Sequence, residues 1–485
     1  MQYASWIATV LLVADLLIRI GISLRIIMRR HPVGVSLAWV MVVLALPFAG
    51  AAVYLVFGEL RLGNRRAKWA AEIHEPYQAW LGDLRERCQI DFSTLGPECE
   101  PLAKLTEAAI EIPPMPGNEL CLIDRTDDVF RSIIADIDAA ERTCHMEFYI
   151  WNCGGLADEV ADALLRAAGR GVICRVLVDA VGSREFLGSD MARRMRQGGV
   201  AIQAALPGGL VRGLFVRFDL RMHRKIVILD GQVAYTGSLN MVDPRYFKRD
   251  AGVGQWVDAM VRVRGPAVEG LAITFLEDWE LETGEGVEKL AETGDVHRLA
   301  EQGDAVVQVV PSGPLVRNEA IQQILLMAIY VARRELILTT PYFVPDETML
   351  TALISAARRG VRITIVLPAK VDSLLVRFAG QAHKGELLAA GIRVVLFNGG
   401  LLHTKSITID GQISLFGSLN LDPRSLYLNF EITLSVYDRA FTAELRQLQQ
   451  SYIDQSEAMD LAVWQSRSVL LRFTENVARL VGPLL

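Results

Sequence analysis

Two short segments of the chain carry the same polar residues at the same spacing. From each His, a Lys follows at +2, an Asp at +7, a Gly-Ser pair at +14 and +15 and an Asn at +17, and the copies are 180 residues apart. A lone His-x-Lys pair on a strand usually has no function, but six matching positions exclude coincidence. A purely structural repeat remains the alternative, although a solvated His and Lys need no fixed spacing. Apart from the glycines, the repeated residues are His223, Lys225, Asp230, Ser238 and Asn240, then His403, Lys405, Asp410, Ser418 and Asn420.

The parity of each motif separates catalytic from structural residues. His223 and Lys225 are two apart, so on a strand both side chains leave on the same face. Asp230 lies seven from His223 and precedes Gly231, which is a hairpin signal. We therefore expect Asp230 and its counterpart Asp410 to fix turns. The chain should then return along a neighbouring strand that brings Ser and Asn close to the His–Lys face.

A histidine used as a nucleophile or as an acid and base needs an acceptor on its second ring nitrogen. Strand-like runs after each motif supply one acid each. Asp258 lies 35 residues after His223, and Glu431 lies 28 residues after His403. The sequence predicts that Asp258 orients His223 and that Glu431 orients His403.

The elements around the motifs also repeat. Helices are predicted at 158–169 and 348–359, each followed by a Gly-Val turn and an aliphatic strand. Alternating helices and strands indicate an α/β fold with helices on a mixed sheet. Two such halves would form one pseudo-symmetric catalytic unit. We expect the halves at 115–290 and 291–460, a connector at 61–114 and a tail at 461–485.

Apolar residues make up 51% of the 485-residue chain and are concentrated at the N-terminus. Residues 33–57 carry no charge and are long enough to cross a bilayer, although Pro47 interrupts them. Residues 4–24 are a second candidate, with Asp15 and Arg19 placed to pair on one helix face. We expect a transmembrane hairpin within residues 1–60. A cleaved signal peptide fits less well, because a basic first region is missing and a second apolar run follows.

The location of the soluble part is less strongly indicated. Basic residues flank both sides of the second apolar segment almost equally, so the positive-inside rule is close to a tie. The six cysteines form no CxxC pair and suit a reducing compartment, which favours the cytoplasmic side. The net charge of -6 gives no reason to expect nucleic acid as a partner.

The two motifs resemble the HxK(x)4D signature, with a trailing GSxN, of the phospholipase D superfamily. Within it, nearly the whole chain is similar to bacterial cardiolipin synthases. The matching segments are RFDLRMHRK at 217–225, VDPRYFK at 242–248, VGQWVD at 253–258, TPYFVPD at 340–346 and the ending GPLL at 482–485.

This resemblance implies one active site made by both halves. His223 would attack a phosphodiester and form a phosphohistidine, and His403 would act as acid and then base. The two lysines and Asn240 and Asn420 would hold the phosphate oxygens, with Ser238 and Ser418 as further donors. The family signature includes Asp230 and Asp410, which the parity argument keeps structural. No metal or cofactor is implied, because the lysines and histidines supply the positive charge.

For the whole protein, the resemblance implies transfer of a phosphatidyl group between two phosphatidylglycerol molecules at the bacterial inner membrane. A multi-pass anchor would hold the enzyme at the bilayer that supplies both lipids, and the tail at 461–485 is either an interfacial amphipathic helix or a packed terminal one. A phospholipase D that uses water as acceptor has the same motifs and remains the alternative. A nuclease is disfavoured by the acidic balance, and a scaffold with a relic repeat is disfavoured by two intact motifs.

Overall fold

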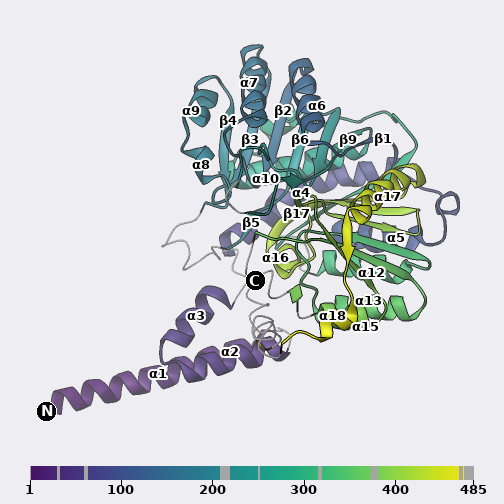
Figure 1. The fold of residues 1–485 in the computed structure, drawn as a ribbon. Coiled ribbons are helices and arrows are strands. Elements are labelled where there is room, and N and C mark those ends of the chain that lie inside the picture. The colour runs from purple at the N-terminus through teal and green to yellow at the C-terminus, as the bar shows by residue number, and fades with distance from the viewer. Residues whose placement is uncertain are drawn as a thin grey trace. The chain divides into compact units, whose positions relative to one another are not determined.

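The computed structural model describes residues 2–29, 33–58, 64–207, 219–248, 252–314, 319–372, 380–381, 383–468 and 473. Residues 1–65 form one compact unit, and nearly all other described residues form a second, larger unit (Figure 1). The first unit is helical and apolar. The second is α/β and carries every motif residue.

The long N-terminal helix α1, Gln2–Met28, is the apolar element that the composition predicts. The stretch Ser5–Met28 contains an 18-residue window with a mean hydropathy of 2.2 and no buried residue, so it is suited to lipid contact. The expected pair of Asp15 and Arg19 forms, at 2.6 Å. Asp15 also accepts a hydrogen bond from the backbone N–H of Phe48, at 2.9 Å. The Asp15 carboxylate thus has partners within this unit.

The second apolar segment is a broken helix. It divides into α2, Val33–Ala45, and α3, Ala49–Phe57, with Phe48 at a φ of 50° between them. The break falls at Pro47, as predicted, because proline cannot donate to a helix ladder. Within the described residues, Ser5–Met28 is the one helix that is long and apolar enough to cross a bilayer. Membrane anchoring therefore rests on α1.

Three helical pieces precede the first half of the larger unit: α4 Asn64–Arg87, η1 Phe92–Thr94 and α5 Cys99–Ile110. The first half then contains β1 Met115–Ile123, α6 Thr126–Ala139, β2 Thr143–Phe148, α7 Leu156–Gly169, β3 Ile173–Asp179, α8 Arg184–Leu187, α9 Asp190–Gln197, β4 Ala201–Ala205, β5 Arg221–Met222, β6 Lys225–Leu229, β7 Val233–Gly237, β8 Trp256–Val257, β9 Met260–Arg264, α10 Ala267–Thr283 and α11 Val287–Thr293.

The second half repeats this order with small differences. It contains β10 Ala305–Ser312, α12 Ala320–Val331, β11 Glu335–Thr339, α13 Glu347–Arg358, β12 Arg362–Pro368, α15 Lys384–Ala389, β13 Arg393–Phe397, β14 Leu401–Leu402, β15 Ser406–Ile409, β16 Ile413–Gly417, α16 Pro423–Tyr427, β17 Asn429–Val436, α17 Arg439–Asp454, β18 Ser456–Ala458 and α18 Leu461–Gln465.

The strands of both halves join into one mixed sheet. Its order is β18-β13-β12-β11-β15-β16-β17-β10-β1-β9-β7-β6-β2-β3-β4, with β5 attached to β17. In each half three strands run parallel, β2-β3-β4 and β11-β12-β13, and the motif hairpin is antiparallel. The halves meet edge to edge through the antiparallel pair β1 and β10. The predicted α/β fold with two pseudo-symmetric halves is confirmed.

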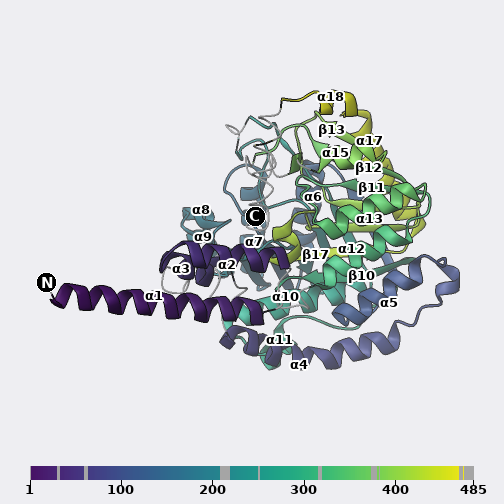
Figure 2. The same cartoon turned by 90° about the horizontal axis from the view of Figure 1, so that it is seen from below.

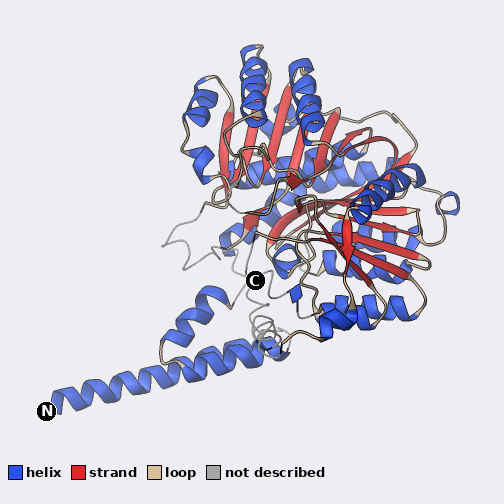
Figure 3. Cartoon of the chain, viewed as in Figure 1, coloured by secondary structure: helices blue, strands red, loops and turns tan. Residues whose placement is uncertain are grey.

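Helices cover both faces of this sheet (Figure 3). The connector helix α5 lies side by side with α12 and α13 of the second half on one face (Figure 2). The predicted motif helices form as α7 and α13, within two residues of the expected bounds. Both bury an alanine- and leucine-rich stripe against the strands, which stabilises a helix more than its propensity does. The sheet is therefore a rigid platform for the loops at its strand ends.

Candidate active site

Each motif histidine lies between a two-residue strand and the first strand of its hairpin. His223 separates β5 from β6, and His403 separates β14 from β15. Both imidazoles are buried, with 7% and 3% of the residue exposed. The amine of Lys225 donates to the carbonyl oxygen of His223 at 2.6 Å, and Lys405 makes the same bond to His403. The His–Lys unit is thus built identically in both halves.

The carboxylates that orient the histidines come from the opposite halves. Nδ1 of His223 lies 2.7 Å from Oε2 of Glu431, and Nδ1 of His403 lies 2.7 Å from Oδ1 of Asp258. The prediction that these two acids orient the histidines is correct, but the predicted pairing within each half is wrong. Because an ionised carboxylate only accepts, each Nδ1 carries the proton and each Nε2 is left with a lone pair.

The crossed pairing follows from two short parallel contacts between the halves. Strand β5 pairs with the start of β17, and β14 pairs with β8. The backbone N–H of His223 donates to the carbonyl of Phe430 at 2.8 Å, and that of His403 donates to Val257 at 2.8 Å. Each contacted residue directly precedes the carboxylate in question. The histidine of one half is therefore held beside the acid of the other.

The two motif serines lie beside the orienting acids. Ser418 Oγ donates to Oε2 of Glu431 at 2.5 Å. Ser238 Oγ accepts from the backbone N–H of Ala259, the residue after Asp258, at 3.1 Å. The Ser418 hydroxyl is thus engaged by a carboxylate, and binding of phosphate by the two serines stays a prediction.

Asn240 fits the predicted role of a phosphate donor. It uses Oδ1 to accept the backbone N–H of Ile150 at 3.2 Å, and its buried Nδ2 has no partner within the described chain. A buried donor without a partner costs free energy unless a ligand supplies an acceptor, so Asn240 supports an anionic ligand. Asn420 is also buried, but its unpartnered atom is Oδ1, an acceptor, so its role as a phosphate donor stays a prediction.

Asp230 and Asp410 are structural, as parity predicts. Asp230 has a φ of 50° and Gly231 a φ of 58°, which is a hairpin turn with two left-handed residues. Its carboxylate accepts three backbone N–H groups, from Glu141, Arg142 and Thr143, at 2.8, 2.7 and 2.9 Å. Asp410 binds three N–H groups in the same way, at residues 333, 334 and 335. Each motif aspartate therefore ties its hairpin to the loop before a parallel strand.

Burial sets the charge states in the site. It lowers the pKa of His223 to about 4 and that of His403 to about 4, so both imidazoles are neutral at pH 7. Burial alone would raise the pKa of Glu431, but the charge of His223 and the hydrogen bond to it bring that pKa below its usual range. Burial also lowers the pKa of Lys225 to about 8. A neutral imidazole beside a lysine that is still charged suits attack on an anion.

Several residues at the site were not predicted. The ring of Tyr149 packs against His223 with centroids 4.8 Å apart, and Trp256 packs against His403 at 4.4 Å. Arg224, between the two motif residues, forms a buried ion pair with Asp278. Trp256 lies two residues before Asp258 on β8, so strand parity could have placed it on the same face. The sequence has no comparable signal for Tyr149, because the second half has a proline at the equivalent position.

Metal ligands are absent from the part of the chain that the structure describes, where no three His, Cys, Asp or Glu side chains gather. Asp258 and Glu431 are engaged by the histidines, and Glu431 also by Ser418. The scheme without a metal remains a prediction.

Comparison with known proteins agrees with this geometry. Residues 133–265 and 325–452 match the family described as "Cardiolipin synthase, PLD-like domain", and residues 7–59 match "Phospholipase_D-nuclease N-terminal". A cardiolipin synthase A of Yersinia pseudotuberculosis is 45% identical over 466 residues, which is 96% of this chain and 96% of that protein. One from Yersinia pestis has the same identity and coverage.

A solved structure shares the fold at lower identity. The phosphatidylserine synthase of Haemophilus influenzae covers 79% of this chain and 99% of its own, with a TM-score of 0.57 and 14% identity. The likeness to the Yersinia proteins extends over nearly the whole length and includes both halves of the catalytic unit. The chain belongs to the cardiolipin synthase family of phospholipase D-type phosphatidyltransferases.

Proposed function

We propose that the enzyme transfers a phosphatidyl group from one phosphatidylglycerol to another, giving cardiolipin and free glycerol. The observation that carries this proposal is the pair of buried histidines, each oriented by the other half's carboxylate at 2.7 Å and flanked by a lysine. Two imidazoles are needed because one must bond to phosphorus while the other moves a proton. The family and its Yersinia relatives support the synthase over a hydrolase.

In the first step Nε2 of His223 attacks the donor's phosphorus, and the bond from phosphorus to the glycerol oxygen breaks. The leaving oxygen takes a proton from His403. In the free enzyme His403 is neutral, because burial lowers its pKa. The negative charge of the bound phosphodiester favours the protonated imidazole beside Asp258, so His403 takes up its proton when the donor binds. Lys225, Lys405 and the asparagine amides hold the non-bridging oxygens.

In the second step a hydroxyl of another phosphatidylglycerol gives its proton to His403 and bonds to phosphorus. The phosphorus–nitrogen bond to His223 breaks, and the neutral imidazole is restored. The intermediate conserves the energy of the original phosphodiester, so no nucleotide is consumed. The hydrolase alternative differs only in having water at this step, and the product distinguishes the two.

For the membrane, we propose a multi-pass anchor in residues 1–60 in the bacterial inner membrane, with the catalytic unit on the cytoplasmic side. The apolar surface of α1 and the six free cysteines support this arrangement. The proposal keeps 61–114 as connector, 115–290 and 291–460 as catalytic halves and 461–485 as tail. Residues 469–472 and 474–485 of the tail, and 217–218 of the first motif segment, lie outside the described residues.

The test is product analysis of the purified enzyme with vesicles of phosphatidylglycerol alone. We expect cardiolipin and glycerol in equal amounts, and reversal of the reaction when glycerol is added. Phosphatidic acid as the main product would contradict the proposal. His223→Ala and His403→Ala should each abolish product while leaving the thermal unfolding transition in place, and rapid quench should trap labelled phosphate on His223 of the wild type.

A further inference from the structure

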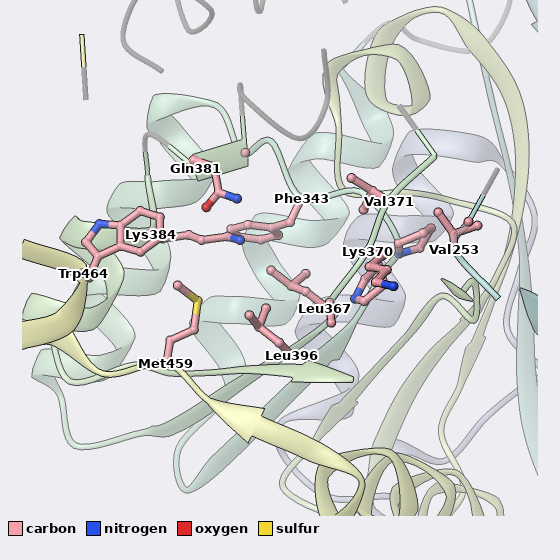
Figure 4. A pocket seen from close by; sticks show the side chains of 15 residues that line it. Val253, Phe343, Leu367, Lys370, Val371, Gln381, Lys384, Leu396, Met459 and Trp464 are labelled. Atoms are coloured by element: carbon pink, nitrogen blue, oxygen red, sulfur yellow. The ribbon is translucent and has the colours of Figure 1, made fainter. Parts of the chain in front are cut away.

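A cavity of about 440 Å³ lies in the second half, at the carboxyl ends of β12 and β13. Leu367 and Leu396 form its floor, and Met459 and Trp464 lie at one end (Figure 4). Lys370 lies at the other end with Val253 and Val371 (Figure 4). The cavity is large enough for part of a lipid, and Lys384 and Gln381 line it between the Lys370 end, here called the cationic end, and the Trp464 end (Figure 4).

The cationic end adjoins the His403 side of the active site. Val253 belongs to the same apolar cluster as Trp256, whose ring packs against His403. Asp372 follows Val371 and binds the hydroxyl of Tyr342 at 2.6 Å. Lys248 donates to Asp372 at 3.1 Å and lies over the ring of Trp256, 5.6 Å from its centroid. A ligand can therefore extend from His403 past Lys370 toward Met459 and Trp464.

In the first half, Trp151 stands at the position equivalent to Phe343. Phe343 lines the cavity and forms an isolated β-bridge with Leu421, the residue after Asn420. Trp151 forms the same backbone bridge with Met241, the residue after Asn240. Trp151 is buried, with 1% exposed, and stacks on the buried ring of Phe186 at 4.8 Å. The two halves thus repeat the catalytic residues, but they differ in the side chains that the structure describes beside them.

We propose that this cavity binds the acceptor phosphatidylglycerol, with Lys370 beside its phosphate and the wall of Leu367, Leu396, Met459 and Trp464 around its glyceryl and proximal acyl part. The inference rests on the proposed function. In that scheme the glycerol leaves and the acceptor hydroxyl enters on the same side, at His403. Only the acceptor brings a second phosphate and two acyl chains to that side, so only that side needs a cavity with these properties.

Two reactions of the same phosphoenzyme separate the acceptor from the donor. Exchange of labelled glycerol into phosphatidylglycerol needs the donor and a small alcohol, whereas cardiolipin synthesis also needs the lipid acceptor. Lys370→Gln removes the charge, and Ala369→Phe places a ring in the cavity from an exposed lining position. Arg393→Gln, which removes an exposed charge at the opposite end of β13, and Ala369→Ser are the matched controls.

Both rates are measured on mixed vesicles of phosphatidylglycerol and phosphatidylcholine, with and without labelled glycerol. We expect the ratio of cardiolipin formed to glycerol exchanged to fall about tenfold in Lys370→Gln and in Ala369→Phe, and to stay at the wild-type value in both controls. An unchanged ratio in the two test variants, or equal loss of both reactions, overturns the inference. Failure of the wild type to make cardiolipin would instead overturn the proposed function.

Discussion

The crossed carboxylates allow a test that links each acid to one histidine. Asp258→Asn and Glu431→Gln each replace a charge-assisted hydrogen bond of 2.7 Å by a neutral one of similar size. Hydrogen bonds to charged groups contribute about 1.5 to 3 kcal/mol. At 1.36 kcal/mol per factor of ten, each variant should lose about 10- to 150-fold in the rate of cardiolipin synthesis. The size of the rate loss does not tell the two acids apart. The dependence of each variant's rate on the leaving group of the donor does.

A donor that carries p-nitrophenol in place of glycerol needs no proton on its leaving group. The first-turnover burst of p-nitrophenolate then depends on the nucleophile and not on the general acid. Asp258→Asn should therefore give a burst close to the wild-type rate, as should His403→Ala. Glu431→Gln should remain slow with this donor, and His223→Ala should give no burst.

The two alanine variants are internal standards for this assay. Whatever role each histidine plays, an acid must share the leaving-group dependence of the histidine that it orients. If Asp258→Asn behaved like His223→Ala, and Glu431→Gln like His403→Ala, the crossed pairing would be refuted. Burst kinetics in a stopped-flow spectrophotometer and cardiolipin yields from the same preparations provide the comparison.

The remaining predictions concern charge, the turns and metals. Because burial lowers the pKa of Lys225 to about 8, its positive charge is present below that pH and lost above it, so kcat/KM for phosphatidylglycerol should fall above about pH 8. Lys225→Arg should move that limb to higher pH, and a flat profile to pH 10 would contradict the assignment. Asp230→Ala removes the acceptor of three backbone N–H groups and should lower the free energy of unfolding by about 2 to 4 kcal/mol in urea titrations, whereas Asp304→Ala, at an exposed position before β10, should change it little. EDTA should leave the rate of cardiolipin synthesis unchanged, and a loss restored by one metal would disprove the metal-free scheme.

Much of the site depends on residues that lie close together in the sequence, and their spacing predicted it. The His–Lys parity places both side chains by the period of a strand, and Asp-Gly predicts a turn from the conformations that glycine permits. The same local rules predicted the pairing of Asp15 with Arg19 and the break at Pro47. Each of these depends on residues a few positions apart, so a single sequence contains the information.

The hydrogen-bond partners of the two motif serines could not be predicted from spacing along the sequence. Whether Ser238 and Ser418 face a phosphate or a carboxylate depends on which residues of β9 and β17 lie opposite the ends of β7 and β16. A shift of one residue in that register would turn both hydroxyls to the other side. The spacing of the motif brings the serines to the site, but it does not specify the partner.

The acid pairing could not be obtained from spacing, because it depends on contacts between residues 145 and 208 positions apart. Strands β5, β8 and β14 have two residues each, which is too short for an alternating pattern. The contact of β5 with β17 and that of β14 with β8 are related by the pseudo-symmetry of the halves, as the two copies of an isologous interface are. In such an interface each half supplies its acid to the histidine of the other half. One His and one acid per half therefore complete a single site with two oriented imidazoles, whereas pairing within each half would orient both histidines without holding them together.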